Sequence, residues 1–391
     1  MLETILQKEV QSFINTHLFT DVQKLAFQKN PFPELDYKIL LNQIVAKSKS
    51  KEKLPTWFRT EGIIYPEKIS IEQTSSEKTA QYKAEIVSGE CLIDLTGGFG
   101  IDDYYFSKKI KHIVHCEINS ELSAIAKHNF QQLGAGNITC FTGDSFDYLK
   151  SSTQKFDWIY IDPSRRSTTK GKVFLLADCL PNVPELLNFY FEKCENILIK
   201  TAPILDISSA LKELQFVKTV HIVSIDNEVK ELLFELKKNY TEAVAIKTID
   251  FGKKVTRFDT FLSEETPNLH FGLPQKYLYE PNSAVMKSGS FELISSRFKL
   301  AKLHPHSHLY TCDLWIDFPG RVFEIIENLT YNKENLKQKF QNQKWNITTR
   351  NFPETVENIR KKWKIKEGGT QYSFFTTDSN NQKIILLCTK I

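Results

Sequence analysis

The sequence has no long apolar run and no obvious leader. Its first ten residues mix Glu3, Lys8 and Glu9 with apolar side chains, whereas a secretory signal needs an uninterrupted apolar core. No later stretch approaches the roughly 20 apolar residues of a membrane helix. We therefore expect a cytoplasmic protein with no membrane partner.

Cysteine is sparse and unpatterned. The seven cysteines form no C-x-x-C pair and lie mostly within apolar runs, so we interpret them as small buried side chains in a reducing compartment. His304, His306 and His308 alternate in the way that zinc ligands can. Pro305 interrupts the strand that would align them, and no cysteine or acidic cluster adjoins them. We predict histidines in a loop or at the surface, and no metal.

A strong charge imbalance is also missing. The net charge is +4, which does not by itself indicate nucleic-acid binding. With 41% hydrophobic and 25% charged residues, the composition is typical of a folded protein. Because 391 residues exceed the size of one ordinary hydrophobic core, we expect two or three domains, with a possible connecting region between them.

Changes in pattern divide the chain into four segments. Residues 1–72 have helical periodicity, with Asp36 as a plausible N-cap, and form a helical N-terminal domain. Residues 73–245 alternate short apolar runs with helical stretches, which is typical of βαβ units. Residues 246–318 are a connecting, small α+β region, and residues 319–391 form a C-terminal α+β domain.

The βαβ segment predicts an α/β fold with a Rossmann-like sheet of seven strands. The strands are expected at 91–95, 112–117, 138–142, 158–162, 197–200, 217–225 and 230–236. Helical stretches separate the first six, which are therefore parallel. Only the turn Asp226-Asn227-Glu228 separates the last two, so the last strand is predicted to be antiparallel.

The C-terminal domain is predicted to contain strands at 322–326, 345–349, 372–377 and 384–388 and helices at 333–341 and 353–363. Trp345, Phe374 and Phe375 are expected in its core. Lysines and arginines gather on its two helices, at Lys333, Lys337, Lys339, Arg360, Lys361, Lys362, Lys364 and Lys366. This local positive charge is either a solvated helix face or an RNA-facing surface.

The strongest motif is D-L-T-G-G-F-G-I-D, from Asp94 to Asp102, directly after an apolar strand. Glycines in such a turn allow positive φ and a close approach of the backbone to a ligand. The helix that follows offers unpaired N–H groups. A nucleoside or nucleotide ligand fits this turn, although an isolated motif of this kind is as often only a tight turn.

Acidic residues follow three further strands. Glu117 ends the second strand about twenty residues after the glycines, Asp144 follows the third, and Asp162 ends the fourth. The carboxyl ends of parallel strands face one crevice, which is where open α/β sheets bind ligands. Four polar strand ends in order are far more specific than the glycine turn alone.

In this order of motifs, residues from about 73 to 238 resemble the class I S-adenosylmethionine-dependent methyltransferases. The resemblance implies S-adenosyl-L-methionine as the cofactor, with Glu117 at the ribose hydroxyls and Asp144 at the adenine amino group. Around the methionine part it places Asp94, Thr96, Gly97, Gly98 and Gly100. It further assigns to cofactor binding Ser76, Lys78 and Thr79 in the covering segment S-S-E-K-T-A, together with Asp102, Ile118, Ser145 and Asp162.

The layout of the whole chain is similar, more narrowly, to a bacterial methyltransferase family with a THUMP-like C-terminal domain. THUMP domains bind RNA, so this resemblance implies an RNA partner, whether rRNA or tRNA. The substrate-facing loop that it assigns to catalysis comprises Asp162, Pro163, Ser164, Arg165 and Arg166. We accordingly hypothesise methyl transfer to a base nitrogen of a structured RNA.

The loop departs from the D-P-P-Y pattern of amino-methylating enzymes, because Ser164 replaces the second proline and Arg165 the aromatic residue. Arg165 and Arg166 either clamp a phosphate or stack on a base, or one of them pairs with Asp162 or Asp157. Carbon methylation through a cysteine is disfavoured, since the fifth strand ends in Lys200. That lysine either faces the crevice or extends into solvent.

Three other functions remain open from the sequence. A nicotinamide-dependent oxidoreductase uses the same kind of turn, but its glycines are spaced G-x-G-x-x-G and it lacks the terminal hairpin. A non-catalytic RNA-binding or assembly protein can retain the methyltransferase fold. A methyltransferase acting on a small molecule or a protein would carry the same motifs.

Overall fold

The computed structural model describes residues 2–66, 68–165, 175–265 and 269–391. These residues form two compact units, one comprising 1–218 with 233–241 and the other 219–232 with 242–391. The division crosses the predicted α/β segment, so the predicted boundary at residue 245 stays a prediction. None of the described helices is both long enough and apolar enough to cross a membrane.

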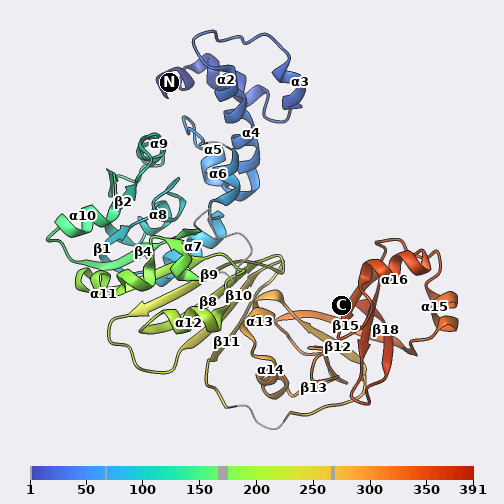
Figure 1. The fold of residues 1–391 in the computed structure, drawn as a ribbon. Coiled ribbons are helices and arrows are strands. Elements are labelled where there is room, and N and C mark those ends of the chain that lie inside the picture. The colour runs from blue at the N-terminus through green and yellow to red at the C-terminus, as the bar shows by residue number, and fades with distance from the viewer. Residues whose placement is uncertain (1, 67, 166–174, 266–268) are drawn as a thin grey trace. The chain divides into compact units, whose positions relative to one another are not determined.

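The first unit begins with short helices, as the apolar periodicity predicts (Figure 1). Asp21 and Asp36 are N-caps, accepting hydrogen bonds from the backbone N–H groups of Gln23 at 3.0 Å and Lys38 at 2.8 Å. The helices are α1 (Leu2–Ile5), α2 (Lys8–Thr16), α3 (Val22–Ala26), α4 (Tyr37–Lys53), α5 (Pro55–Arg59), α6 (Lys68–Gln73) and α7 (Glu77–Ile86).

The parallel part of the sheet follows from the apolar runs of the βαβ units. Strands β1 (Gly89–Asp94), β2 (Ile110–Glu117), β3 (Ile138–Thr142), β4 (Phe156–Ile161) and β7 (Cys194–Thr201) pair in parallel in the order β7-β4-β1-β2-β3. The connecting helices are α8 (Ile101–Phe106), α9 (Ser120–Gln132), α10 (Ser145–Ser151) and α11 (Val183–Lys193), and α12 (Ile207–Glu213) follows β7. A parallel order of this kind brings the carboxyl ends of β1, β2, β3 and β4 to one edge.

The predicted terminal hairpin is present. Strands β8 (Val217–Ile225) and β9 (Glu228–Lys237) are neighbours in the sheet, joined only by Asp226 and Asn227. These two residues have φ values of 49° and 64°, which a tight two-residue hairpin turn requires. Asn and Asp tolerate this conformation better than other side chains that carry a Cβ.

Among the described residues the sheet has nine strands, two more than the seven predicted. Its order is β11-β10-β8-β9-β7-β4-β1-β2-β3, in which β10 (Ala245–Phe251) pairs in parallel with β8, and β11 (Val255–Phe261) pairs antiparallel with β10. The sequence pattern does not show which sheet a strand joins, because that pairing depends on residues distant in sequence.

The C-terminal part of the second unit contains a separate sheet of seven strands, in the order β13-β14-β12-β15-β18-β17-β16. Its strands are β12 (Tyr277–Pro281), β13 (Ala301–Lys302), β14 (Tyr310–Cys312), β15 (Gly320–Thr330), β16 (Asn346–Arg350), β17 (Gln371–Thr377) and β18 (Lys383–Lys390). Its helices are α13 (Ser283–Ser288), α14 (Phe291–Phe298), α15 (Lys333–Lys339) and α16 (Val356–Trp363).

Helices α15 and α16 cover one face of this sheet (Figure 1). Leu336 of α15 and Ile359 of α16 are buried with Trp345 and Phe375 in one cluster, while Phe374 packs in a second cluster with Phe323 and Leu386. The predicted core position of Trp345, Phe374 and Phe375 is therefore confirmed. It follows the alternation of side chains along β17, which places neighbouring residues on opposite faces.

Candidate active site

A pocket of about 820 Å³ lies at the carboxyl ends of β1, β2, β3 and β4. The sequence-predicted residues that line it are Asp94, Thr96, Gly97, Gly98, Gly100, Asp102, Glu117, Ile118, Asp144, Ser145, Asp162 and Ser164. All of them lie in the first compact unit. The volume falls within the range of pockets that take small molecules and cofactors.

The hydroxyl of Thr96 joins the first and fourth strand ends. It donates a hydrogen bond to the Oδ1 of Asp94 at 3.1 Å and accepts one from the backbone N–H of Asp162 at 2.7 Å. The backbone N–H of Thr96 also donates to the same Asp94 oxygen, at 2.7 Å. The glycine turn and the loop that starts at Asp162 are therefore held in one fixed relation.

The turn itself has no room for side chains. A Cβ on Gly97 would lie 2.3 Å from the ring of the buried His115, and one on Gly100 would lie 2.3 Å from the ring of Phe130. Gly100 also has a φ of 78°, which favours glycine. The motif is thus a packing requirement as well as a ligand-binding turn.

Glu117 is fixed by the backbone around it. Its Oε2 accepts from the N–H of Gly98 at 2.8 Å and its Oε1 from the N–H of Asn119 at 2.7 Å. A carboxylate has about four lone-pair sites, so both oxygens can still accept a further donor from the pocket.

Asp102 lies under the pocket in a network of buried partners. Ser75 and Tyr160 donate hydroxyl hydrogen bonds to its Oδ2, each at 2.8 Å, and the Lys83 ammonium is 3.2 Å from its Oδ1. Burial alone would raise the pKa of Asp102, but the Lys83 and Lys200 charges and the two hydrogen bonds lower it below its ordinary value. Asp102 is consequently an ionised anchor for α8.

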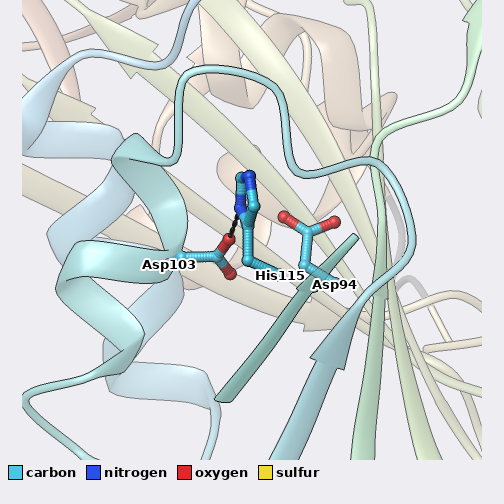
Figure 2. A group of neighbouring side chains, drawn as sticks. All are labelled: Asp94, Asp103 and His115. Atoms are coloured by element: carbon cyan, nitrogen blue, oxygen red, sulfur yellow. Dashed lines mark hydrogen bonds and ion pairs between the residues drawn. The ribbon is translucent and has the colours of Figure 1, made fainter. Parts of the chain in front are cut away.

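A second buried cluster contains Asp94, Asp103 and His115 (Figure 2). His115 Nδ1 lies 2.6 Å from the Oδ2 of Asp103. Burial and then repulsion from Asp103 raise the pKa of Asp94, and burial and then repulsion from Asp102 raise that of Asp103. Burial lowers the pKa of His115, which is therefore neutral at pH 7. The cluster retains protons where exposed carboxylates would have lost them.

Asp162 and Lys200 both line the pocket and form an ion pair. The Lys200 ammonium is 2.5 Å from the Asp162 carboxylate, and Lys200 is only 13% exposed. Of the two positions that the sequence left open, the structure therefore has the lysine in the crevice. Ser164 lines the pocket and, with Arg165, forms β5 (Ser164–Arg165), which pairs with β6 (Cys179–Leu180), after the short helix η1 (Leu176–Asp178).

Three predicted catalytic residues gain little support from the structure. Pro163 is buried beside the pocket but does not line it. Arg165 is described only in its backbone, and Arg166 lies outside the described residues. The sequence alternatives for the two arginines therefore stay as they were.

The structure shows where the predicted covering segment lies, and its role in cofactor binding stays a prediction. Ser76 caps α7, accepting from the N–H of Thr79 at 3.2 Å, and Lys78 is exposed. The pocket is lined instead by Gln73, Thr74 and Ser75. A serine directly before a helix is also a common N-cap, and this signal favours the structural role of Ser76.

Beside the predicted Asp144 and Ile118, the lining includes residues that sequence reasoning missed, among them Phe146 and Asn182. Asp144 caps α10, accepting from the N–H of Phe146 at 2.8 Å. Beside it, the apolar side chains of Ile118 and Phe146 are 74% and 37% exposed. The far wall of the pocket comes from Leu180, Pro181, Asn182 and Leu186. No local motif marks this wall, because these residues are brought in by the chain between β4 and α11.

The three histidines of the sequence hypothesis are not gathered as a metal site. His304 lies 2.9 Å from Asn351 Nδ2 and 3.1 Å from Asn381 Oδ1, and His308 stacks on Phe291. Within the described part of the chain, the group of side chains that is close enough to hold an ion is the buried set Asp94, Asp103 and His115.

Comparison with solved structures decides the family. A presumed methyltransferase from Porphyromonas gingivalis W83 is 31% identical, with a TM-score of 0.88 over 99% of this chain and 98% of the other. Residues 277–319 match a family model described as a ferredoxin-like domain, and residues 320–390 one described as THUMP domain-like. The chain belongs to the class I S-adenosylmethionine-dependent methyltransferases with a THUMP-like domain.

Two further solved structures are similar to only part of the present chain. An rRNA methylase from Streptococcus thermophilus is 16% identical over 41% of this chain and 94% of its own, with a TM-score of 0.30. TrmK of M. capricolum, solved with S-adenosyl-homocysteine, is 17% identical over 41% and 68%, with a TM-score of 0.32. No curated protein matches the sequence.

Replacing Thr96 by Val should lower the stability of the methyltransferase, because the hydroxyl links the glycine turn to the loop that starts at Asp162. The substitution keeps the shape but leaves the Asp162 N–H without the acceptor that the hydroxyl supplies, and leaves Asp94 Oδ1 with only the backbone N–H of residue 96 as a donor. We therefore expect a loss of about 2 kcal/mol in the free energy of unfolding. Urea unfolding of the purified protein measures this. Thr96→Ser, which keeps the hydroxyl, is the control, and equal stability of the two variants would contradict the role given to the hydroxyl.

Replacing Asp103 by Asn should flatten the pH dependence of stability. Because the pKa of Asp103 is raised in the fold above its ordinary value of 3.8, its contribution is fully present below about pH 4 and is lost as pH rises through the raised pKa. The stability of the variant relative to the wild type should therefore increase as the pH rises from about 4 to 7. Thermal unfolding across this range measures it, with the exposed Asp147→Asn as control. Parallel profiles for wild type and Asp103→Asn would be evidence against the assignment.

Proposed function

We propose that this methyltransferase transfers the methyl group to a base nitrogen of a structured RNA. The observation that supports it most directly is the convergence of Thr96, Glu117, Asp144 and Asp162 on one pocket. The glycine turn, Glu117 and the loop that starts at Asp162 thus line one site. Methyl transfer requires such a site, because the methyl donor and the acceptor must meet in line.

The residues present fit the cofactor. We propose that Glu117 accepts hydrogen bonds from the ribose hydroxyls, since backbone donors hold both of its oxygens at the pocket wall. The exposed apolar side chains of Ile118 and Phe146 offer faces to a flat purine. The glycine turn lines the pocket directly after β1, where the methionine part would lie. When bound, S-adenosyl-L-methionine supplies a methyl group already activated on a sulfonium.

Asp162 is the residue that we assign to the acceptor base. Its carboxylate is 39% exposed in the pocket and can accept a hydrogen bond from the N–H of an incoming base. Lys200 offsets the carboxylate charge and limits its rotation. The backbone N–H of Asp162 is fixed by Thr96, so the accepting oxygen is positioned before the substrate arrives.

The second unit is the part that we assign to RNA capture. Some of its basic side chains are engaged locally, since Lys339 pairs with Glu327 and Lys362 with Glu354. Lys361 and Lys364 are exposed near the end of α16. Exposed lysines on a helix end supply the sequence-independent attraction to phosphates on which RNA binding depends.

Asp162→Ala should abolish transfer of labelled methyl from S-adenosyl-L-methionine to RNA while leaving cofactor binding intact. Loss of a positioned group at the acceptor is expected to slow the reaction about 100-fold or more. Total RNA, DNA and protein fractions should be tested side by side, with Asp147→Ala as control. Label found only in DNA or protein, or undiminished RNA labelling by the variant, would contradict the proposal.

Replacing Lys361, Lys362 and Lys364 together by Glu should weaken RNA binding and lower its salt dependence by about one unit of slope per lost phosphate contact. Lys247, Lys253 and Lys299 changed to Glu are the matched control, because Lys299 and Lys364 share a left-handed conformation, with φ of 53° and 54°. RNA affinity is measured across salt concentrations. Equal loss in both triple variants would show that net charge alone is responsible.

A further inference from the structure

A second pocket, of about 810 Å³, lies among the N-terminal helices of the first unit. It is lined by α2, the middle of α4, the end of α5 and the segment that follows to Gly62. None of the motifs that define the cofactor pocket contributes to it. The described structure thus has a second hollow in the same unit, for which the methyltransferase chemistry provides no occupant.

Lys47 of α4 is the unusual residue of this pocket. It is only 7% exposed, yet among the described residues no hydrogen bond or ion pair reaches its ammonium. Burial lowers the pKa of Lys47, and the nearby carboxylate of Glu61 offsets this only in part. A lysine with a packed stem, whose ammonium has no protein partner at a pocket wall, is available to an anionic ligand.

The rest of the lining has the character of a nucleotide site. Lys8 and Arg59 add two positive charges, against the single carboxylate of Glu61. Hydroxyl and amide side chains surround them, and Phe58 adds an aromatic face. The uncharged polar members are Gln11, Ser12, Asn15, Thr16 and Thr60. A phosphate alone would need far less space, whereas a phosphate with its base and sugar uses the amides and the ring as well.

The pocket is joined to the catalytic sheet by hydrogen bonds within the unit. His128 Nε2 lies 2.8 Å from the carbonyl oxygen of Gly62, and Asn129 bonds both the N–H and the C=O of Ile64. Both residues belong to α9, the helix that follows Glu117. A ligand held here is therefore held at a fixed distance from the cofactor pocket.

We propose that this pocket binds a nucleotide, with Lys47 and Arg59 holding its phosphate. The nucleotide is a unit of the RNA strand or a free mononucleotide. The RNA form rests on the proposed function, and the free form does not.

The test is calorimetric titration of the full-length protein, saturated with S-adenosyl-homocysteine so that the cofactor pocket is filled. The probes are inorganic phosphate, adenosine 5′-monophosphate and a single-stranded RNA of about 12 nucleotides. We expect adenosine 5′-monophosphate or the RNA to bind more tightly than phosphate. Lys47→Met should weaken that binding about tenfold, Arg59→Gln several-fold, and Glu61→Gln should strengthen it.

Lys47→Met is informative because it should not unfold the protein. Removing a partly desolvated charge while keeping the packed stem should not lower the melting temperature, so weaker binding by a variant of unreduced stability identifies a binding role. Undiminished affinity of Lys47→Met and Arg59→Gln for every probe would overturn the proposal, as would equal binding of phosphate and both nucleotide probes.

The two proposals can fail separately. Lys47-dependent binding of adenosine 5′-monophosphate without methyl transfer to RNA would contradict the proposed function and support the nucleotide site. Methyl transfer to RNA that survives Lys47→Met with an unchanged KM, together with no binding of the mononucleotide, would overturn the pocket and leave the proposed function standing.

Discussion

The hydroxyl of Thr96 is the contact on which the candidate active site depends. One short side chain satisfies the buried Asp94 and fixes the backbone of Asp162, so it couples the end of β1 to the end of β4. The glycine turn lies directly after it and the substrate-facing carboxylate directly beyond its partner. A site built in this way needs no ligand to bring its two loops into register, which lowers the cost of ordering them on binding.

Below this joint the sheet edge contains three carboxylates, Asp94, Asp102 and Asp103, each almost fully buried. They are stabilised in different ways. Asp102 is ionised and has Lys83 beside it, whereas Asp94 and Asp103 have raised pKa values and share their surroundings with the neutral His115. Uneven protonation avoids placing three like charges in a medium that cannot screen them.

The sequence predicts the fold class and the motif residues of the pocket, because motifs and strand ends are local patterns. Thr96, Glu117 and Asp162 could be placed from their positions after apolar runs. The far wall around Asn182 and the contact of Lys200 with Asp162 could not, since each depends on pairing across many residues. Ser76 shows a further limit: the same letters that suggest a ligand contact also cap a helix, and only the geometry separates the two.

The boundary between the ferredoxin-like and THUMP-like segments, at Gly320, lies inside one sheet. Two family models meet between residues 319 and 320, yet β12 pairs with β15 across that boundary, and a Cβ on Gly320 would lie 2.1 Å from the carbonyl oxygen of Glu280. The buried Glu280 carboxylate is held by Arg321 and by Arg350, both from the other side of the boundary. The two segments thus share one sheet and one buried charge. Exchanging either segment alone would leave the Glu280 carboxylate buried without its partners, so the two segments depend on one another for their stability.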